Sequence, residues 1–204
     1  MLFRSDLDWR DIDDTLPRLR AAIAAAAPEE LGHHLLELGR LHVDCRGRPA
    51  DWTPEDWSEL VLGLLGDVPM AERMAFTDII ADVGRLPIDV LLTLMADDIL
   101  VSRPLHERGR FDDDSLHALL DRDRSEPVQL FCARRVGVGD SVTDRLVEGG
   151  MPKVWLTLAA NVAARLSFAT FDRFSRLTRA QDAMDRALST RHDLPYEKIG
   201  RAHV

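Results

Sequence analysis

The chain has 204 residues, of which 46% are hydrophobic, and its formal net charge is −9. This apolar content is sufficient for a sizeable core and excludes a globally disordered chain. Residues 1–164 hold 18 basic and 30 acidic residues, a net charge of −12, whereas residues 165–204 hold 8 and 5, a net charge of +3. The acidic majority excludes nucleic-acid binding over the whole surface, because such binding requires cations that neutralise phosphate.

The sequence predicts neither export nor membrane insertion. The first residues, MLFRSDLDWRDIDD, are acidic and lack the apolar stretch of a secretory signal. The longest apolar run, around Ala21–Ala27, is too short to span a bilayer. Cys45 and Cys132 lie 87 residues apart and indicate no disulfide framework. We expect a cytoplasmic protein.

Apolar residues recur at helical spacing along the chain, between short breaks at Gly and Pro, and predict an all-α protein. The first two predicted helices, 11–27 and 29–43, precede the segment CRGRPADW (45–52), which has no periodicity and is the best candidate linker. Thr53 and Pro54 are typical of a helix start. Later helices are predicted after Pro69 and Pro87, and then at 99–109, 112–121, 126–136, 140–148, 152–163, 168–177, 180–190 and 195–201.

The second half of the chain is weakly self-similar. At an offset of 26 residues Leu130 matches Leu156, and Ala133 matches Ala159. The same offset pairs Val128 with Val154, Val136 with Val162, Leu116 with Val142 and Leu120 with Leu146. A third copy at 28 residues pairs Leu156 with Met184 and Ala159 with Ala187. Units of this length accommodate two short helices that stack on their neighbours. We expect Leu130, Leu156 and Met184 to occupy equivalent buried positions, and likewise Ala133, Ala159 and Ala187.

From about residue 53 onward the sequence resembles an uncharacterised bacterial family, mainly alphaproteobacterial, of degenerate HEAT-like helical repeats. The segments that carry the resemblance are IADVGRLPIDVLLTLMADDILVSRPLHERG (80–109), DDSLHALLDRDR (113–124), SVTDRLVEGG (141–150) and LAANVAARLS (158–167). The resemblance implies a right-handed superhelix, or solenoid, of two-helix repeats, and it implies no activity. We therefore predict an N-terminal helical segment or cap at 1–52 and a HEAT-like repeat domain at 53–204.

One group of residues near the N-terminus has the composition of a metal site. His33, His34 and Glu37 lie within one helical turn, and His42 and Cys45 follow. A structural zinc site requires paired ligands at two places, and the second pair is missing. We therefore expect an ordinary, partly exposed helix face, no metal and no other cofactor.

Other polar clusters also have simple explanations. Asp112-Asp113-Asp114 lacks the spacing of a calcium loop and stands at a helix start, where acids are favoured. Gly137 and Gly139 lack the third glycine of a dinucleotide turn, and no nucleophile elbow is present. The sequence therefore indicates no catalytic residue and no enzymatic activity.

The candidate partner-binding residues lie in one predicted helix, 168–177. Phe168, Phe171 and Phe174 recur at every third residue, and either form inter-repeat core or line a partner groove. Arg173 and Arg176 lie beside them and belong to a set of arginines that forms either a basic stripe or surface ion pairs with Asp172, Asp182 and Asp185. That set is Arg165, Arg173, Arg176, Arg179, Arg186 and Arg191.

These patterns lead to one leading functional hypothesis and two alternatives. We expect a non-enzymatic interaction or regulatory module that binds another protein on the concave face of the solenoid. The first alternative is a nucleic-acid-binding repeat protein that uses the basic C-terminal repeats, and the second is an enzyme of unrecognised type. The sequence identifies neither the partner nor the oligomeric state.

Overall fold

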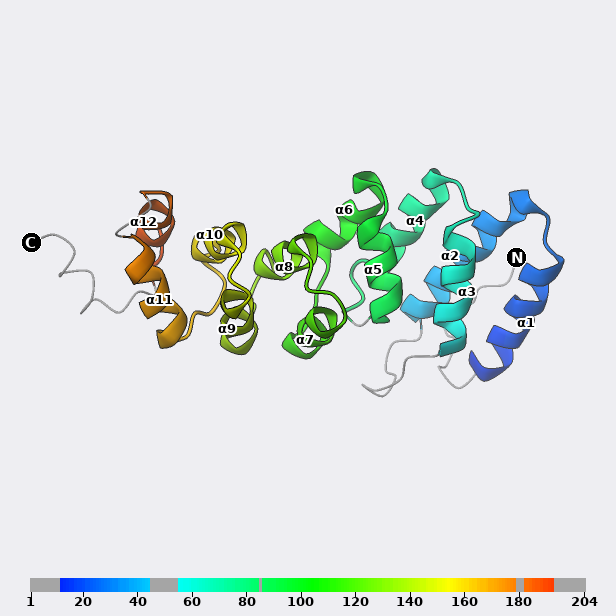
Figure 1. Cartoon of the computed structure of the whole chain (residues 1–204). Coiled ribbons are helices and arrows are strands. Elements are labelled where there is room, and N and C mark those ends of the chain that lie inside the picture. The colour runs from blue at the N-terminus through cyan, green and yellow to red at the C-terminus, as the bar shows by residue number, and fades with distance from the viewer. Residues whose placement is uncertain (1–11, 45–54, 85, 179–181, 193–204) are drawn as a thin grey trace, which may run out of the picture. The chain divides into compact units, whose positions relative to one another are not determined.

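The computed structural model describes residues 12–44, 55–84, 86–178 and 182–192, and within these ranges the chain is helical and contains no strand (Figure 1). The chain divides into two compact units, Met1–Arg110 and Phe111–Val204. The prediction of an all-α protein is confirmed for the described residues. The predicted linker 45–52 and the predicted helix 195–201 lie outside them.

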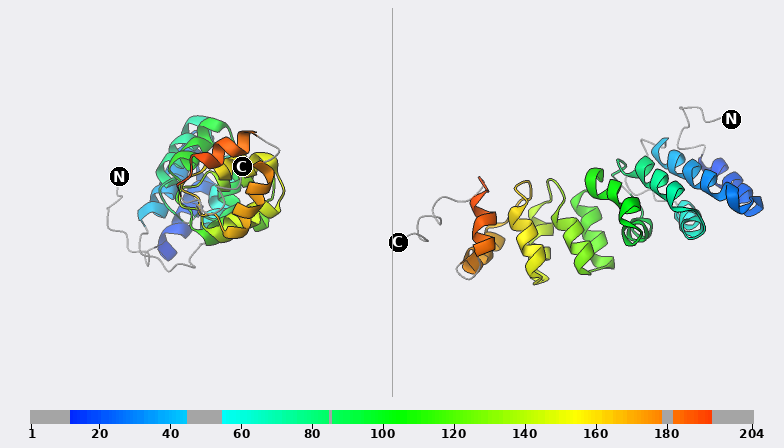
Figure 2. Two further views of the ribbon diagram at one scale, coloured as in Figure 1. Left: turned by 90° about the vertical axis from the view of Figure 1, so that its left-hand side faces the viewer. Right: turned by 90° about the horizontal axis from the view of Figure 1, so that it is seen from above.

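The first unit packs its helices in two layers, which Figures 1 and 2 show from three sides. In one layer α2 contacts α4 and α4 contacts α6; in the other, α1 contacts α3 and α3 contacts α5. The helices are α1 (Ile12–Ala25), the short 3-10 helix η2 (Pro28–Glu30), α2 (Leu31–Asp44), α3 (Glu55–Leu65), α4 (Met70–Ile80), α5 (Ile88–Ala96) and α6 (Ile99–Arg108).

Glycine allows α2 and α4 to approach closely. Gly32 and Gly39 are seven residues apart and so lie on one face of α2. A Cβ atom at Gly39 would lie 3.0 Å from the Phe76 ring, and one at Gly32 would lie 2.7 Å from the Glu72 side chain. A Cβ atom at either position would require the Glu72 side chain or the Phe76 ring to move.

Trp57 of α3 packs against α2, the helix that precedes residues 45–54. Its side chain is 1% exposed, its Nε1 donates a hydrogen bond to the Leu38 carbonyl at 2.9 Å, and its ring stacks on His42 at 4.4 Å. Helices α2 and α3 therefore share one core. The domain boundary predicted at 52/53 falls inside the segment that the structure does not describe, and it stays a prediction.

The second unit also has two layers. In one layer α7 contacts α9 and α9 contacts α11; in the other, α8 contacts α10 and α10 contacts α12. Consecutive helices pair across the layers, α7 with α8, α9 with α10 and α11 with α12. The helices are α7 (Asp113–Arg122), α8 (Glu126–Ala133), α9 (Asp140–Glu148), α10 (Pro152–Ala160), α11 (Phe168–Thr178) and α12 (Asp182–Ser189).

Helix starts follow the predicted polar signals. The Asp112 carboxylate accepts hydrogen bonds from the backbone N–H and the hydroxyl of Ser115, at 2.9 and 2.6 Å, and so caps α7. The neighbouring Asp113 carboxylate accepts from the Gly139 N–H at 3.0 Å. Both carboxylates thus accept hydrogen bonds at a helix end or a loop. This agrees with the prediction that the acidic run caps a helix. Helices α8 and α10 end about three residues earlier than predicted, at Ala133 and Ala160.

The 26-residue offset correctly matches several buried positions. All of the following residues are at most 3% exposed: Leu116 with Val142, Leu120 with Leu146, Val128 with Val154, and Ala133 with Ala159. The pairing of Leu130 with Leu156 as buried residues is wrong, because Leu130 is half-buried and Leu156 is 38% exposed. Val136 and Val162 are 89% and 60% exposed.

The third copy follows two different offsets. In the first helix of the pair, Phe174 is buried 28 residues after the buried Leu146. In the second helix, Met184 is buried 30 residues after Val154, so its assignment to Leu156 is wrong. The reason is a longer first helix, since α11 has 11 residues where α9 has 9. Ala187, matched with Ala159, is half-buried.

Side chains that follow one helix pair donate hydrogen bonds to backbone carbonyls at the end of the previous pair. The amide of Asn161, which follows α10, donates to the carbonyls of Ala133 and Arg135 at the end of α8, at 2.9 and 2.8 Å. Arg191, which follows α12, is 4% exposed. Its guanidinium donates to three carbonyls at the end of α10, those of Leu158 (3.3 Å), Asn161 (2.6 Å) and Ala164 (2.6 Å).

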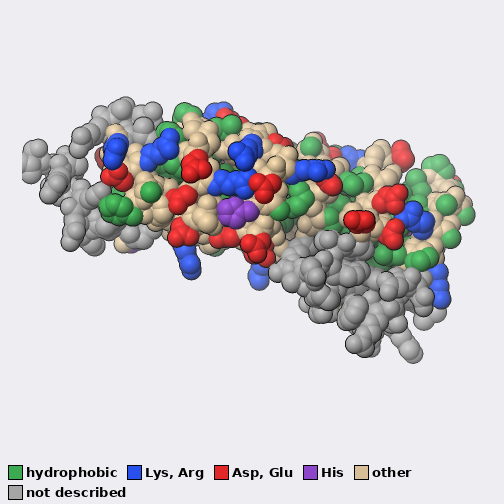
Figure 3. Space-filling model, turned by 60° about the horizontal axis from the view of Figure 1, so that its bottom comes forward, with side chains coloured by type: hydrophobic (Ala, Val, Ile, Leu, Met, Phe, Trp, Pro, Cys, Tyr) green, Lys and Arg blue, Asp and Glu red, His purple; other side chains and the backbone are tan. Residues whose placement is uncertain are grey.

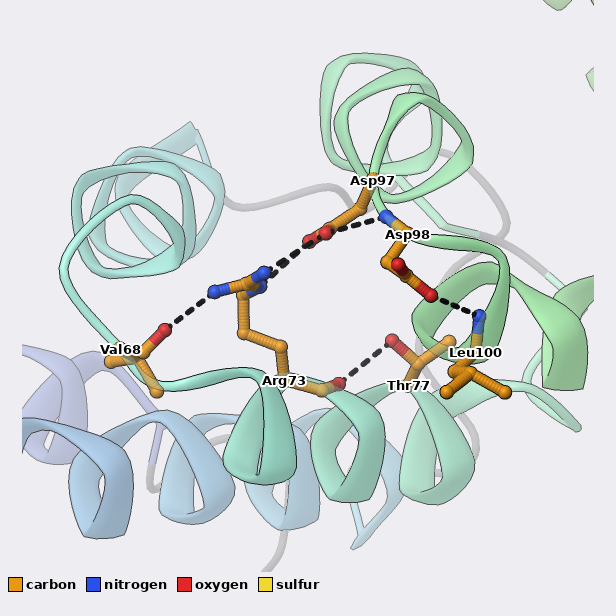
Figure 4. Close-up of polar contacts among 6 residues, drawn as sticks. All are labelled: Val68, Arg73, Thr77, Asp97, Asp98 and Leu100. Atoms are coloured by element: carbon orange, nitrogen blue, oxygen red, sulfur yellow. Dashed lines mark hydrogen bonds and ion pairs between the residues drawn. The ribbon is translucent and has the colours of Figure 1, made fainter.

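In the first unit, Arg73 of α4 binds two loops at once (Figure 4). Its Nε and Nη2 donate to the Asp97 carboxylate at 2.7 and 3.0 Å, and its Nη1 donates to the Val68 carbonyl at 2.7 Å. The next residue, Asp98, caps α6 by accepting from the Leu100 N–H at 2.8 Å. The Arg73 hydrogen bonds lower the pKa of Asp97 below its usual 3.8.

Replacing Ala159 by Leu is expected to destabilise the protein by about 1–3 kcal/mol, because the extra atoms overpack a position with no exposed area. The measurement is the free energy of unfolding from urea denaturation. Ala160→Leu is the matched control, since the neighbouring Ala160 is exposed on the same helix, and should change stability by less than about 0.5 kcal/mol. Equal effects of the two substitutions would contradict the described packing of α10.

Replacing Asp97 by Asn should lower the free energy of unfolding at neutral pH by about 1–3 kcal/mol. Because the pKa of Asp97 is lower in the folded protein, the ion pair stabilises above the ordinary value of 3.8, and this contribution is lost as the pH falls below it. The variant should therefore lose less stability than the wild type on acidification below about pH 4. Thermal melts across this range measure the effect, with Asp67→Asn, an exposed acid of the same unit, as the control. Parallel pH curves for wild type and Asp97→Asn would refute it.

Candidate functional site

The three phenylalanines of α11 have different environments. Phe168 is 65% exposed, whereas Phe171 and Phe174 are 7% and 0% exposed and belong to the core. A spacing of three residues turns each successive side chain by about 60° around a helix. The row predicted as one stripe therefore rotates from solvent into the core, and only Phe168 presents its ring at the surface.

Arg173 and Arg176 are also exposed on α11. The Arg173 guanidinium lies 5.1 Å from the centre of the Trp155 ring, and the Trp155 indole donates to the Val147 carbonyl at the end of α9 at 2.9 Å. The Arg176 side chain is 79% exposed and pairs with Asp172 at 2.6 Å. The accessible part of α11 thus combines an aromatic ring with two cations.

The other arginines of the set do not extend this surface into a single stripe. Arg186 is exposed and its Nε donates to the Asp182 backbone carbonyl at 3.3 Å rather than to a carboxylate. Arg191 is buried at the end of α10, so its assignment to a surface stripe is wrong. Arg165 is exposed, and Arg179 lies outside the described residues. The predicted ion pair with Asp172 is present.

A polar cluster that the sequence reasoning missed joins α7 to α9. His117 Nε2 lies 3.1 Å from the Ser141 hydroxyl, and His117 Nδ1 lies 3.4 Å from Arg145 Nη1. Because a guanidinium only donates, Nδ1 is the accepting nitrogen and Nε2 carries the proton. The imidazole therefore donates to Ser141 and cannot take its proton, which is the reverse of the arrangement in an activated serine.

Arg145 fixes the position of this cluster. Its guanidinium donates to the His117 carbonyl at 3.2 Å and to the Asp121 carboxylate. The hydrogen bond from Arg145 lowers the pKa of Asp121. His117 and Asp121 of α7 thus meet Ser141 and Arg145, which lie 24 or 28 positions later than their partners, only because α7 and α9 are neighbours in one layer.

A pocket of about 460 Å³ adjoins this cluster, between the ends of α7, α8 and α9. Gln129 of α8 is 5% exposed, and its Nε2 donates to the Arg124 carbonyl at 2.7 Å. This bond fixes the orientation of the amide, because a flipped amide would place two oxygens against each other. The wall of the pocket consists of Leu120, Arg124, Gln129, Ser141, Asp144, Arg145, Leu146, Glu148 and Gly149.

Two titratable groups of the second unit are buried or held by hydrogen bonds. Burial raises the pKa of the Cys132 thiol to about 12, so that almost none of it is thiolate at neutral pH. Asp144 is engaged by the hydroxyls of Ser167 and Thr170, at 2.5 and 2.7 Å, at the start of α11. Amide, hydroxyl and guanidinium groups at these positions suit recognition of a partner by hydrogen bonds and charge.

The described residues considered for a metal lie in two places in the first unit. Glu37 contacts His33 Nε2 at 3.3 Å and His34 Nδ1 at 3.0 Å, whereas His42 is buried against Trp57. Within the described residues no three His, Cys, Asp or Glu side chains are placed to hold a metal ion. Cys45 lies outside those residues, and the expectation that the protein needs no metal stays a prediction.

The surface charges are mixed. On the face drawn in Figure 3, Lys and Arg side chains alternate with Asp and Glu rather than forming one basic patch.

In the part of the chain that the structure describes, no helix is both long and apolar enough to cross a membrane.

A match to a known protein family falls on the part of the chain that contains helices α7 to α12. No curated protein and no solved structure matches the sequence. The match begins within α6 and extends through the second unit, a shorter region than the resemblance noted from residue 53 onward. Residues 101–201 match the family described as uncharacterised protein conserved in bacteria (DUF2336), and this region is thus a bacterial domain of unknown function.

Proposed function

We propose that the protein is a non-enzymatic, cytoplasmic interaction module that binds another protein through its second unit. The observation that carries the proposal is the accessible side of α11, where Phe168 is 65% exposed close in sequence to Arg173 and Arg176. Aromatic residues and arginines dominate the energetics of protein–protein interfaces. An exposed aromatic ring gains free energy when a partner removes it from water.

The finer architecture is part of this proposal. We infer that the helix pairs are HEAT-like repeats of a right-handed solenoid, and that the partner binds its concave face. In support, each unit has two layers of short helices, and four matched pairs of positions in the second unit, Leu116 with Val142, Leu120 with Leu146, Val128 with Val154 and Ala133 with Ala159, are buried alike. Repeats of this kind contact only their neighbours and leave one long face open for a partner.

A nucleic-acid partner is the alternative, through the basic C-terminal repeats. Two observations favour a protein partner instead. The second unit holds 14 basic and 14 acidic residues, so it has no net charge to attract phosphate. Arg191 is occupied at the end of α10.

The test is affinity purification of the protein from the native organism, with quantitative mass spectrometry of the bound proteins. Phe168→Ser should remove a specific partner, whereas Val162→Ser should retain it, because Val162 is similarly exposed, at 60%, and lies outside α11. The comparison of these two variants separates recognition by α11 from general surface hydrophobicity. If both variants lose the partner, or if both retain it, the proposed surface on α11 is wrong.

The nucleic-acid alternative has its own measurement. Fluorescence anisotropy with duplex and single-stranded DNA and RNA across a salt series should show only weak binding that salt abolishes. Tight binding at physiological salt that is lost in an Arg173→Ala, Arg176→Ala double variant would reverse our ranking of the two functions.

A further inference from the structure

The net charge of the protein is confined to its first unit. Residues 1–110 hold 12 basic and 21 acidic residues, a net charge of −9, which is the formal charge of the whole chain. Within this unit, residues 51–100 hold 11 acidic and 2 basic residues. One of these two bases, Arg73, is engaged by Asp97. Residues 51–100 therefore form the most acidic part of the molecule.

A surface groove of about 580 Å³ lies in this acidic region, between α3 and α5. Neither helix contains a lysine or an arginine. The described residues that line the groove are three acids and five uncharged residues, four of which are apolar. They are Glu55, Ser58, Glu59, Leu62, Leu86, Pro87, Ile88 and Asp89.

The two kinds of lining residue define the chemistry of an occupant. Glu55 and Asp89 are exposed, and Leu62 and Ile88 are only half-buried, so that carboxylates and apolar side chains are both accessible. Glu59 pairs with Arg20 at 2.8 Å, and both side chains of this pair are largely exposed, at 69% and 46%. Such a pair contributes little free energy and does not neutralise the groove strongly. A volume of this size accommodates several side chains.

We propose that this groove binds a segment of a partner protein that carries apolar side chains flanked by lysine or arginine. The apolar residues of the groove remove the apolar side chains of the segment from water, and the three carboxylates complement its cations. Nucleic acids and acidic peptides are repelled by the same charges. The site lies in the first unit and uses none of the α11 residues, so it goes beyond the proposed function and its failure is distinguishable from the failure of that proposal.

The experiment is a fluorescence-anisotropy titration of the full-length protein with three labelled synthetic peptides of equal length. The first peptide has leucines at helical spacing and arginines elsewhere; the second has glutamate in place of arginine; the third has serine in place of leucine. Only the first should bind at physiological salt. A Glu55→Gln, Asp89→Asn double variant should weaken its binding about fivefold, since each exposed charge contributes modestly.

The matched control removes the same number of charges outside the groove. Asp67→Asn with Glu107→Gln neutralises two exposed acids of the first unit, and should leave the affinity for the first peptide unchanged. Circular dichroism of both double variants verifies that they are folded. Equal weakening by the two double variants would show that only the overall negative charge acts, and it would overturn the proposal.

Three other results would also overturn it. The first is no binding of the arginine–leucine peptide, and the second is equally tight binding of the glutamate or the serine peptide. The third concerns a second copy of this chain as the occupant. If sedimentation shows a wild-type dimer that the groove variant converts to a monomer, the groove is a self-association surface rather than a site for a partner.

Discussion

The fold depends on how very short helices satisfy the carbonyls at their ends. The last four carbonyls of an α-helix have no partner within the helix, and α8 and α12 are only eight residues long. Half of the carbonyls of such a helix therefore need another donor. Backbone N–H groups of the following residues supply some of these donors. In the second unit, side chains from the following helix pair add others, since Asn161 binds carbonyls at and just after the end of α8 and Arg191 binds carbonyls at and just after the end of α10.

This requirement gives a structural role to several arginines in a chain that has 24 arginines and only 2 lysines. A guanidinium presents five donors in a fixed plane and can bind several carbonyls at once. Arg191 does so while buried, and Arg73 and Arg108 join a carbonyl to a carboxylate in the first unit. Arginines used in this way are not available to bind phosphate. Our two proposals place recognition on the cations of α11 and on the carboxylates between α3 and α5.

Most helices could be predicted from the sequence because their signals are local. Apolar spacing, Pro at helix starts and acids at N-terminal turns placed the described helices within a few residues, and Asp112 caps α7 as expected. Tertiary features were not predictable in this way. Leu156 repeats at the correct offset but faces solvent, because the pattern of one helix does not identify its neighbours. Arg191 was assigned to the surface because nothing in its sequence context indicates three carbonyls that begin 33 residues earlier. The contact of His117 with Ser141 also arises only from packing.

The central claim is that side chains which satisfy helix ends hold successive helix pairs together, and replacing Arg191 by Met tests it most directly. Methionine keeps much of the apolar volume but leaves the buried carbonyls at the end of α10 without these donors. The free energy of unfolding, from urea denaturation, should fall by about 2–4 kcal/mol, because hydrogen bonds from a charged donor are lost at a buried site. Arg186→Met, at an exposed position of α12, should change it by less than about 0.5 kcal/mol. If Arg191→Met is as stable as the wild type, these hydrogen bonds do not hold the helix pairs together and the claim is wrong.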